Sequence, residues 1–240
     1  MNKFLINIFE NIRKPAFLYL FLFFLIGCNQ NKTFMPMANK KTFHYDVTFI
    51  DKEKKKEIFK QAYFFIGKKD NNFTYLRNDG KLITFTRDRN ALFLSELNYT
   101  HASLVDLPSD KLFFEKENIL LKFPTSKDES WTSQDQTTLI MKMGYDRIYK
   151  TLLPIQINNK IQEIDVSVKL GDKILKNCVL VVGEGDTSYN PGPPLTAINI
   201  KIKQKHWYSP KYGLVKVVRE ELSDSETMGN IFYEKKLNLD

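Results

Sequence analysis

Few residues of this sequence stand in arrangements that could carry out chemistry. The three histidines, His44, His101 and His206, are far apart, and none has the His-x-x-x-His or carboxylate–histidine spacing of a metal site. The chain has no Gly-x-Ser-x-Gly and no phosphate-binding glycine loop, and Gly-Glu-Gly-Asp at 183–186 offers too few oxygens for calcium. We therefore expect no enzyme activity, no metal and no cofactor. An exported hydrolase whose site is assembled only by folding is the remaining alternative.

The first of the two cysteines, Cys28, follows an uncharged apolar run over residues 17–27. The run is short for a membrane-spanning helix, which needs about 20 apolar residues. The cations Lys3, Arg13 and Lys14 precede it. A positive segment followed by a short apolar run is typical of a secretory signal peptide, so we expect residues 1–27 to be removed and exclude them from the fold.

The end of this run, Leu25-Ile26-Gly27-Cys28, matches the bacterial lipobox, and the segment resembles the signal of a bacterial lipoprotein. The resemblance implies cleavage before Cys28, a diacylglyceryl thioether on Cys28 and a third acyl chain on the new amino terminus. Two or more acyl chains anchor a protein durably. The residue after the cysteine is Asn29 rather than Asp, which implies the periplasmic leaflet of the outer membrane. The alternative is a signal-anchor with a chance cysteine.

The second cysteine, Cys178, has no partner once Cys28 is acylated. It lies in the apolar stretch Lys-Asn-Cys-Val-Leu-Val-Val, where a lone cysteine is most often a small buried hydrophobe. The full chain has 36 Lys+Arg and 28 Asp+Glu, and the cations are scattered along the chain. Such a surface suits anionic lipid headgroups, and we expect no nucleic-acid partner.

The mature chain divides into a lipidated, flexible tether over residues 28–41 and a single antiparallel β domain over residues 42–240. Many segments alternate apolar and polar residues, the pattern of half-buried strands. The clearest is 197–208, where Ile198, Ile200 and Ile202 alternate with lysines. We predict an all-β fold, mainly antiparallel, with a curved sheet or half-barrel and at most one or two short helices. The ambiguous stretch 108–114 is the candidate for a helical turn.

The second half, about residues 117–222, carries a series of landmarks: Phe-Pro before a tryptophan, a glycine turn before a cysteine strand, and Tyr-x-Pro followed by Gly-Leu-Val-Lys. The positions are Phe123, Pro124, Trp131, Gly171, Cys178, Tyr208, Pro210, Gly213, Leu214, Val215 and Lys216. The series resembles exported half-barrel proteins of the LolA/LolB lipoprotein-carrier type, many of which have no assigned role.

Large side chains with polar tips, such as Trp207 and Tyr208, suit the rim of a cavity or the edge of a core. Together with Trp131, they are the candidate ligand contacts, although a hairpin with a packed aromatic corner is the favoured interpretation of Trp207 and Tyr208. Two roles follow. The first is a non-enzymatic lipoprotein that binds an apolar ligand, such as acyl chains, in a cavity of about 300–1,000 Å³. The second is an accessory subunit of an outer-membrane or secretion complex, with an exposed apolar patch or sheet edge for an envelope protein partner.

Replacing Cys28 with serine tests the anchor. Serine has no thiol to acylate, so we expect Cys28→Ser to lose incorporation of labelled palmitate and to leave the membrane fraction. Cys178→Ser is the matched control and should keep both properties. Membrane fractionation of Cys28→Ser identical to that of the unaltered protein would contradict the assignment.

Overall fold

The computed structural model describes residues 34–35, 42–99, 118–143, 147–190, 192, 196–225 and 229–239. Of residues 95–99, 140–143 and 147–150 only the backbone is described. The chain separates into residues 1–33 and a compact unit over residues 34–240. Cys28, most of the predicted tether and the predicted helical turn at 108–114 lie outside the described residues. Within the described ranges, no helix is long and apolar enough to cross a membrane.

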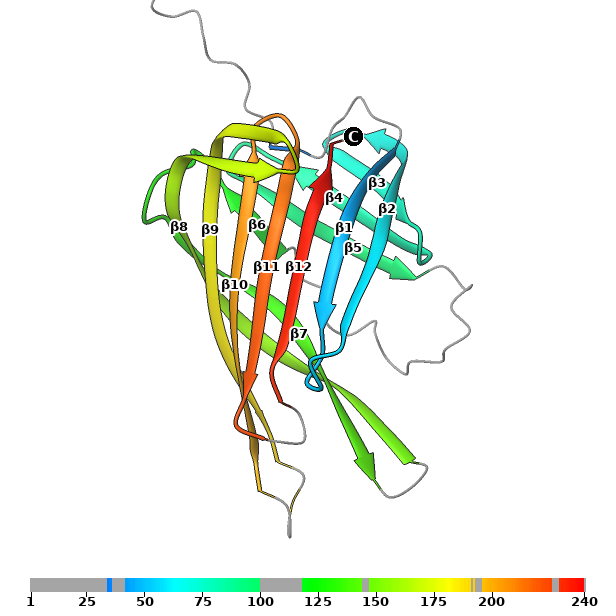
Figure 1. The fold of residues 1–240 in the computed structure, drawn as a ribbon. Helices are drawn as coiled ribbons and strands as arrows, with labels where there is room; N and C mark the ends of the chain where they lie inside the picture. Colours follow the sequence, from blue (N-terminus) through cyan, green and yellow to red (C-terminus); the bar gives the residue numbers. More distant parts are fainter. Residues whose placement is uncertain are drawn as a thin grey trace, which may run out of the picture. The chain divides into compact units, whose positions relative to one another are not determined.

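The compact unit is one antiparallel sheet of twelve strands, which curls until it is nearly closed into a barrel (Figure 1). Its order is β6-β5-β4-β3-β2-β1-β12-β11-β10-β9-β8-β7. The strands are β1 (Thr42–Ile50), β2 (Lys56–Lys69), β3 (Asn72–Arg77), β4 (Lys81–Arg87), β5 (Ala91–Tyr99), β6 (Asn118–Lys122), β7 (Ser130–Met143), β8 (Arg147–Leu170), β9 (Lys173–Tyr189), β10 (Ile198–Ser209), β11 (Gly213–Ser223) and β12 (Ile231–Asn238). The predicted all-β, mainly antiparallel curved sheet is confirmed, with no helix among the described residues.

The alternating pattern of β10 is present as predicted. Ile198, Ile200 and Ile202 are buried inside the curved sheet, whereas Lys201, Lys203 and Lys205 are exposed. Successive side chains of a strand point to opposite faces, so a strand with one apolar face must turn that face inward. The same rule orients β1, where Tyr45 and Val47 are buried.

Strand β8 differs from the sequence-based expectation. The stretches 145–157 and 160–171 read as separate strands, but they form a single strand of 24 residues. Its pairing with β9 shifts register repeatedly between Ile161 and Val168, and Asp165 and Asn177 have positive φ angles of 59° and 58°. These bulges rotate side chains out of strict alternation. The sequence alternates Ile164, Val166, Val168 and Leu170, which predicts that these four residues share one face. Because of the bulges, Ile164 is instead 43% exposed while Val168 is buried.

The bulges also bend the β8–β9 hairpin over one end of the sheet (Figure 1). We call residues 164–178 the cap. Val168, Leu170 and Cys178 of the cap pack in the central cluster with Tyr45 of β1 and Tyr75 of β3. The ammonium of Lys173 donates to the carbonyl oxygen of Leu239, which ties the cap to the end of β12. The cap therefore closes one end of the barrel.

Cys178 is buried in this cluster, as the sequence indicated. Burial raises the pKa of its thiol to about 11, against a weaker opposing effect from Ser209. The thiol is therefore protonated at neutral pH, and because the nucleophile is the thiolate, Cys178 is unreactive.

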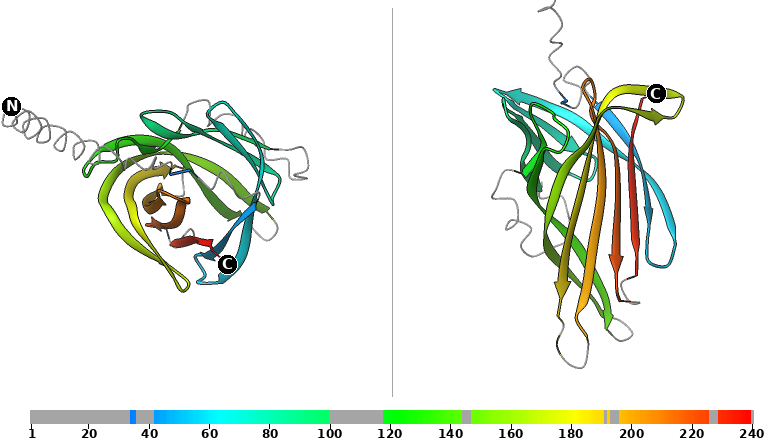
Figure 2. Two further views of the ribbon diagram at one scale, coloured as in Figure 1. Left: turned by 90° about the horizontal axis from the view of Figure 1, so that it is seen from above. Right: turned by 90° about the vertical axis from the view of Figure 1, so that its left-hand side faces the viewer.

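The sheet curls round (Figure 2), and side chains join its two edge strands, β6 and β7. The Asn118 amide accepts from the Gln134 N–H at 2.8 Å and donates to the Gln134 carbonyl oxygen at 2.5 Å, as a peptide group of a neighbouring strand would. The Trp131 indole N–H donates to the Ile119 carbonyl oxygen at 2.9 Å. Lys122 contacts the Ser130 carbonyl oxygen at 3.0 Å. We call this contact the seam.

The chain enters the barrel at the seam. Phe34 and Met35 are almost fully buried, in one cluster with Trp131 and Tyr208. The Phe34 N–H donates to the Pro210 carbonyl oxygen at 3.2 Å, in the turn between β10 and β11. Only residues 29–33 separate this fixed point from Cys28.

The seam generates a stability prediction. Asn118→Ala leaves both the N–H and the carbonyl of Gln134 unpaired at a partly buried position, which costs about 1–3 kcal/mol. We expect urea unfolding to give a lower free energy of unfolding by this amount. Asn158→Ala, at an exposed position of β8, is the control and should leave that free energy nearly unchanged. Equal effects of the two substitutions would contradict this account of the seam.

Candidate functional site

A cavity of about 440 Å³ lies at the end of the barrel opposite the cap. Its volume falls within the predicted range for small-molecule sites. The lining residues come from β1, β7, β11 and β12 and are Phe49, Gln136, Thr137, Thr138, Arg219, Glu221, Ile231 and Tyr233. The cavity therefore has walls on opposite sides of the curved sheet.

Strand register positions one wall of the cavity. Phe49 pairs with Tyr233, and Tyr233 pairs with Arg219, so these three residues form a row across β1, β12 and β11. Directly paired residues of neighbouring strands share a face. Phe49 continues the inward apolar positions of β1, and Arg219 and Glu221 continue the inward positions of β11 after Val215 and Val217. The row is thus apolar at one side and charged at the other.

Arg219 joins the two walls. Its Nη1 donates to Asp135 Oδ2 at 2.5 Å and its Nη2 to the Gln136 carbonyl oxygen at 3.1 Å, both on β7, while Nε donates to Glu221 Oε1 at 2.7 Å. Burial alone would lower the pKa of Arg219, but Asp135 and Glu221 outweigh it and hold the pKa above its usual value. The Thr137 hydroxyl donates to the second Glu221 oxygen at 2.5 Å. This network braces the barrel at the base of the cavity.

The brace constrains the ligands that the cavity can take. Arg219 is charged, yet three of its nitrogens already donate to protein acceptors. Two carboxylates face this single guanidinium, so the base of the cavity does not attract an anion. The remaining lining, chiefly Phe49, Ile231 and Tyr233, suits an uncharged apolar group.

A second set of polar side chains, which includes His206 and Lys235, lies nearer the cap. Burial lowers the pKa of His206 to about 4, with smaller lowering by Arg219 and Lys235 against the opposing effect of Asp135. His206 Nδ1 lies 3.4 Å from the hydroxyl of Tyr208. Lys235 donates to the Tyr63 hydroxyl at 2.9 Å, with its ammonium over the rings of Tyr63 and Tyr45. His206 is therefore neutral at pH 7, inside an interior already braced by paired charges.

The three tryptophan and tyrosine residues predicted to contact a ligand do not line this cavity. Trp131 and Tyr208 are buried together near the seam. Trp207 packs against the central cluster instead, with the Lys216 ammonium 5.0 Å from its ring centre. The structure thus brings Trp131 and Tyr208 together and leaves Trp207 apart. That they contact a ligand stays a prediction, as does acylation of Cys28.

Sequence reasoning missed the cavity-lining residues. Arg219 and Glu221 were detectable in part, because they interrupt an alternation whose preceding inward residues, Val215 and Val217, are apolar. Charges at inward positions indicate a functional or bracing role. Their partners on β7, Asp135 and Thr137, lie 84 residues away in sequence, and no local pattern indicates that contact.

The glycine-rich segment 183–186 lies on the wall of the barrel. Gly183 and Gly185 are buried, whereas Glu184 and Asp186 are exposed. A Cβ atom on Gly183 would lie 2.7 Å from Asn159 Oδ1, so glycine is needed for close packing of β9 on β8. The segment therefore has a packing role. Within the described ranges, no three His, Cys, Asp or Glu side chains are grouped so as to hold a metal ion.

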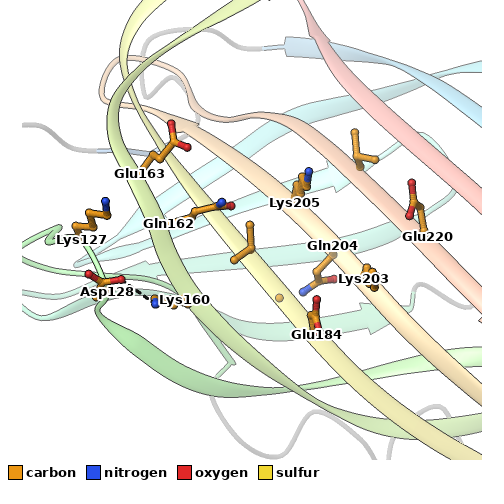
Figure 3. Close-up of a pocket in the computed structure, with 13 residues that line it drawn as sticks. Lys127, Asp128, Lys160, Gln162, Glu163, Glu184, Lys203, Gln204, Lys205 and Glu220 are labelled. Atoms are coloured by element: carbon orange, nitrogen blue, oxygen red, sulfur yellow. Dashed lines mark ion pairs between the residues drawn. The ribbon is translucent and has the colours of Figure 1, made fainter.

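A larger groove of about 740 Å³ lies over β8–β11 (Figure 3). Its charged lining residues carry both signs: Lys127, Lys160, Lys203, Lys205, Asp128, Glu163, Glu184 and Glu220. Lys160 and Asp128 form an ion pair at 2.8 Å with both side chains more than half exposed. Alternating exposed charges are typical of a solvated face, and exposed pairs contribute little. The apolar cavity is the stronger candidate site.

No protein-family model and no curated protein matches this chain. Two solved structures are similar in fold. One is a protein from Bacteroides fragilis, provisionally described as exported with a YmcC-like fold, which is 12% identical with a TM-score of 0.41, over 86% of this chain and 99% of that one. The other, provisionally described as a lipoprotein from Parabacteroides distasonis, is 13% identical with a TM-score of 0.41, over 86% and 98%. Likeness at this level assigns neither a family nor a function. The LolA/LolB resemblance stays a prediction.

His206 generates a pH prediction. Its pKa is about 4 in the folded protein and about 6.5 when unfolded, so its contribution to stability is complete above pH 6.5 and is lost as the pH falls toward 4. Between pH 7 and pH 5, we expect the free energy of unfolding to fall by about 1–2 kcal/mol more in the unaltered protein than in His206→Gln.

The control for this measurement is His44→Gln, on β1, where the histidine is exposed. Urea unfolding at both pH values should give His44→Gln the same pH dependence as the unaltered protein. If His206→Gln also keeps that dependence, His206 does not enter the fold in its neutral form.

Proposed function

We propose that this protein is a lipid-anchored, periplasm-facing lipoprotein of the bacterial outer membrane, without enzymatic activity, that binds an apolar ligand in the open end of its barrel. The carrying observation is the cavity of about 440 Å³ lined by Phe49, Ile231 and Tyr233. The lipobox ending at Cys28 supports the anchor. The ligand class is an acyl chain or a comparable apolar group, because the charges at the base of the cavity are already paired.

The distribution of packing supports a site confined to one end. Two clusters of aromatic and aliphatic side chains fill the barrel beneath the cap. They are the central cluster, which contains Tyr45 and Tyr75, and the cluster at the seam, which contains Trp131 and Tyr208. Burying a ligand there would require these side chains to move, which well-packed interiors resist. At the other end the cavity is preformed, and ligand sites are usually largely preformed.

The alternative function is an accessory subunit of an envelope complex. The observation that favours it is a row of exposed apolar residues on the outer face of β2, where Ile58, Phe64 and Ile66 are 68%, 40% and 58% exposed. Exposed apolar patches often mark protein contacts. Strand addition at the edges is disfavoured, because the seam already occupies backbone groups of β6 and β7.

A cavity-filling substitution tests the binding function. In Ile231→Trp, the indole would occupy the space that an apolar ligand needs. We expect the affinity of residues 29–240, which contain the whole compact unit, for the apolar fluorophore N-phenyl-1-naphthylamine to fall about tenfold or more, or about 1.4 kcal/mol. Fluorescence titration measures the change, and native mass spectrometry of the same fragment detects co-purified lipid.

The matched control is Phe232→Trp, at the next residue of β12, whose side chain points to the opposite face. It should leave the affinity for the fluorophore unchanged. Equal affinities of all three proteins, together with a stable envelope partner in detergent extracts, would reject the binding function in favour of the accessory one.

A further inference from the structure

One end of the barrel is fixed close to the proposed lipid anchor. Phe34 is held by its bond to Pro210 and by the packing of its ring 5.6 Å from that of Phe123. Six residue steps separate Phe34 from Cys28. A fully extended chain covers at most about 3.5 Å per residue, so the acylated cysteine lies within about 21 Å of the turn between β10 and β11.

Register places several turns at this same end. Thr42 at the start of β1 pairs with Phe64 near the end of β2, so Lys68 and Lys69 lie beyond it. The bond between Lys173 and Leu239 places the cap beside the end of β12. The cap, the β2–β3 turn and the β10–β11 turn therefore form one surface, which we call the capped end (Figures 1 and 2).

The capped end is basic. The cap and the β2–β3 and β10–β11 turns carry six exposed lysines against three exposed aspartates, Asp70, Asp165 and Asp172; the lysines are Lys68, Lys69, Lys169, Lys173, Lys176 and Lys211. The β4–β5 and β6–β7 turns at the same end add two exposed cations, Arg89 and Lys127, and two exposed aspartates, Asp88 and Asp128, so the excess of three cations is unchanged. Ile174, at the cap, is 61% exposed among these lysines. Cations around an exposed apolar side chain are the pattern of a surface that rests on anionic lipid.

The length of the barrel excludes the opposite orientation, in which the barrel stands with its open end on the membrane. Strand β10 has 12 residues and runs from the open end to the capped end, a distance of about 36 Å at 3.3 Å per residue. This exceeds the reach of the segment between Cys28 and Phe34. A barrel that stood upright with its open end on the membrane would therefore hold Phe34 too far from that membrane for Cys28 to be anchored in it.

We propose that the capped end is a membrane-apposed surface, whose lysines lie on anionic phospholipid headgroups beside the acylated cysteine. The mouth of the cavity then faces away from that membrane. The proposal depends on the anchor in the proposed function and adds an orientation to it. Anionic headgroups are the occupant that the excess of lysine selects, because the attraction between them is electrostatic and sensitive to salt.

Headgroup quenching tests the orientation in the full-length acylated protein. A fluorophore is attached to Asp172→Cys at the capped end or to Asn230→Cys at the open end, since buried Cys178 does not react. The vesicles contain phosphatidylcholine and phosphatidylglycerol with a nitroxide-labelled headgroup lipid. We expect quenching at residue 172 to exceed that at residue 230 by about threefold, and to fall by about half when phosphatidylglycerol is omitted.

The charge-removing variant is Lys169→Gln, Lys176→Gln and Lys211→Gln combined. Its matched control is Lys201→Gln, Lys203→Gln and Lys205→Gln combined, three exposed lysines on the outer face of β10. The first should reduce quenching at residue 172 as omission of phosphatidylglycerol does, and the second should not. Unchanged circular dichroism and Tm verify that both variants fold.

The experiment distinguishes failure of the proposed lipid anchor from failure of the proposed orientation. If the unaltered protein does not float with the vesicles at all, the anchor fails, and the orientation fails with it. If it floats but both labels are quenched equally, or if the two triple variants behave alike, the orientation is overturned while the anchor stands.

Discussion

A sheet that curls toward a barrel must satisfy the two edges it leaves, and the rest of this structure depends on how it does so. The amide of Asn118 bonds to both backbone groups of Gln134, and the indole of Trp131 reaches the carbonyl oxygen of Ile119. These contacts hold the first and last strands of the sheet order together without a strand ladder. They keep the apolar inner face enclosed and occupy backbone groups at the two edges that another chain could otherwise extend.

Local alternation made the class of fold predictable. The inward isoleucines of β10 and the aromatic face of β1 are visible in the sequence because period-two patterns depend only on neighbouring residues. The 24-residue β8 was not predictable in the same way, since its bulges break the pattern that defines a strand. Ile164 was misassigned for this reason. The expected buried state of Cys178 was right, because an apolar run of that length indicates a covered strand.

The site was less predictable than the fold, because its contacts are long-range. Arg219 meets Asp135 across 84 residues of sequence, and Trp207 and Tyr208 are adjacent in sequence yet pack in different clusters. Their aromatic character suggested a shared rim, but the fold separates them. The inward charges of β11 were the one available signal, and they mark a brace as much as a site. A polar interior held by paired charges still specifies one arrangement of the walls, since an unpaired charge there would be costly.

The bulged β8–β9 hairpin closes one end of the barrel, so a ligand could not pass from one end of the barrel to the other. A ligand bound as proposed would enter beside Phe49 and Ile231 and would meet the Arg219 brace and then packed aromatic side chains, which among the described residues block passage along the axis. It must leave by the opening through which it came. One bound ligand would therefore have to leave before another could enter. Transfer of the ligand to another protein would take place at that single opening.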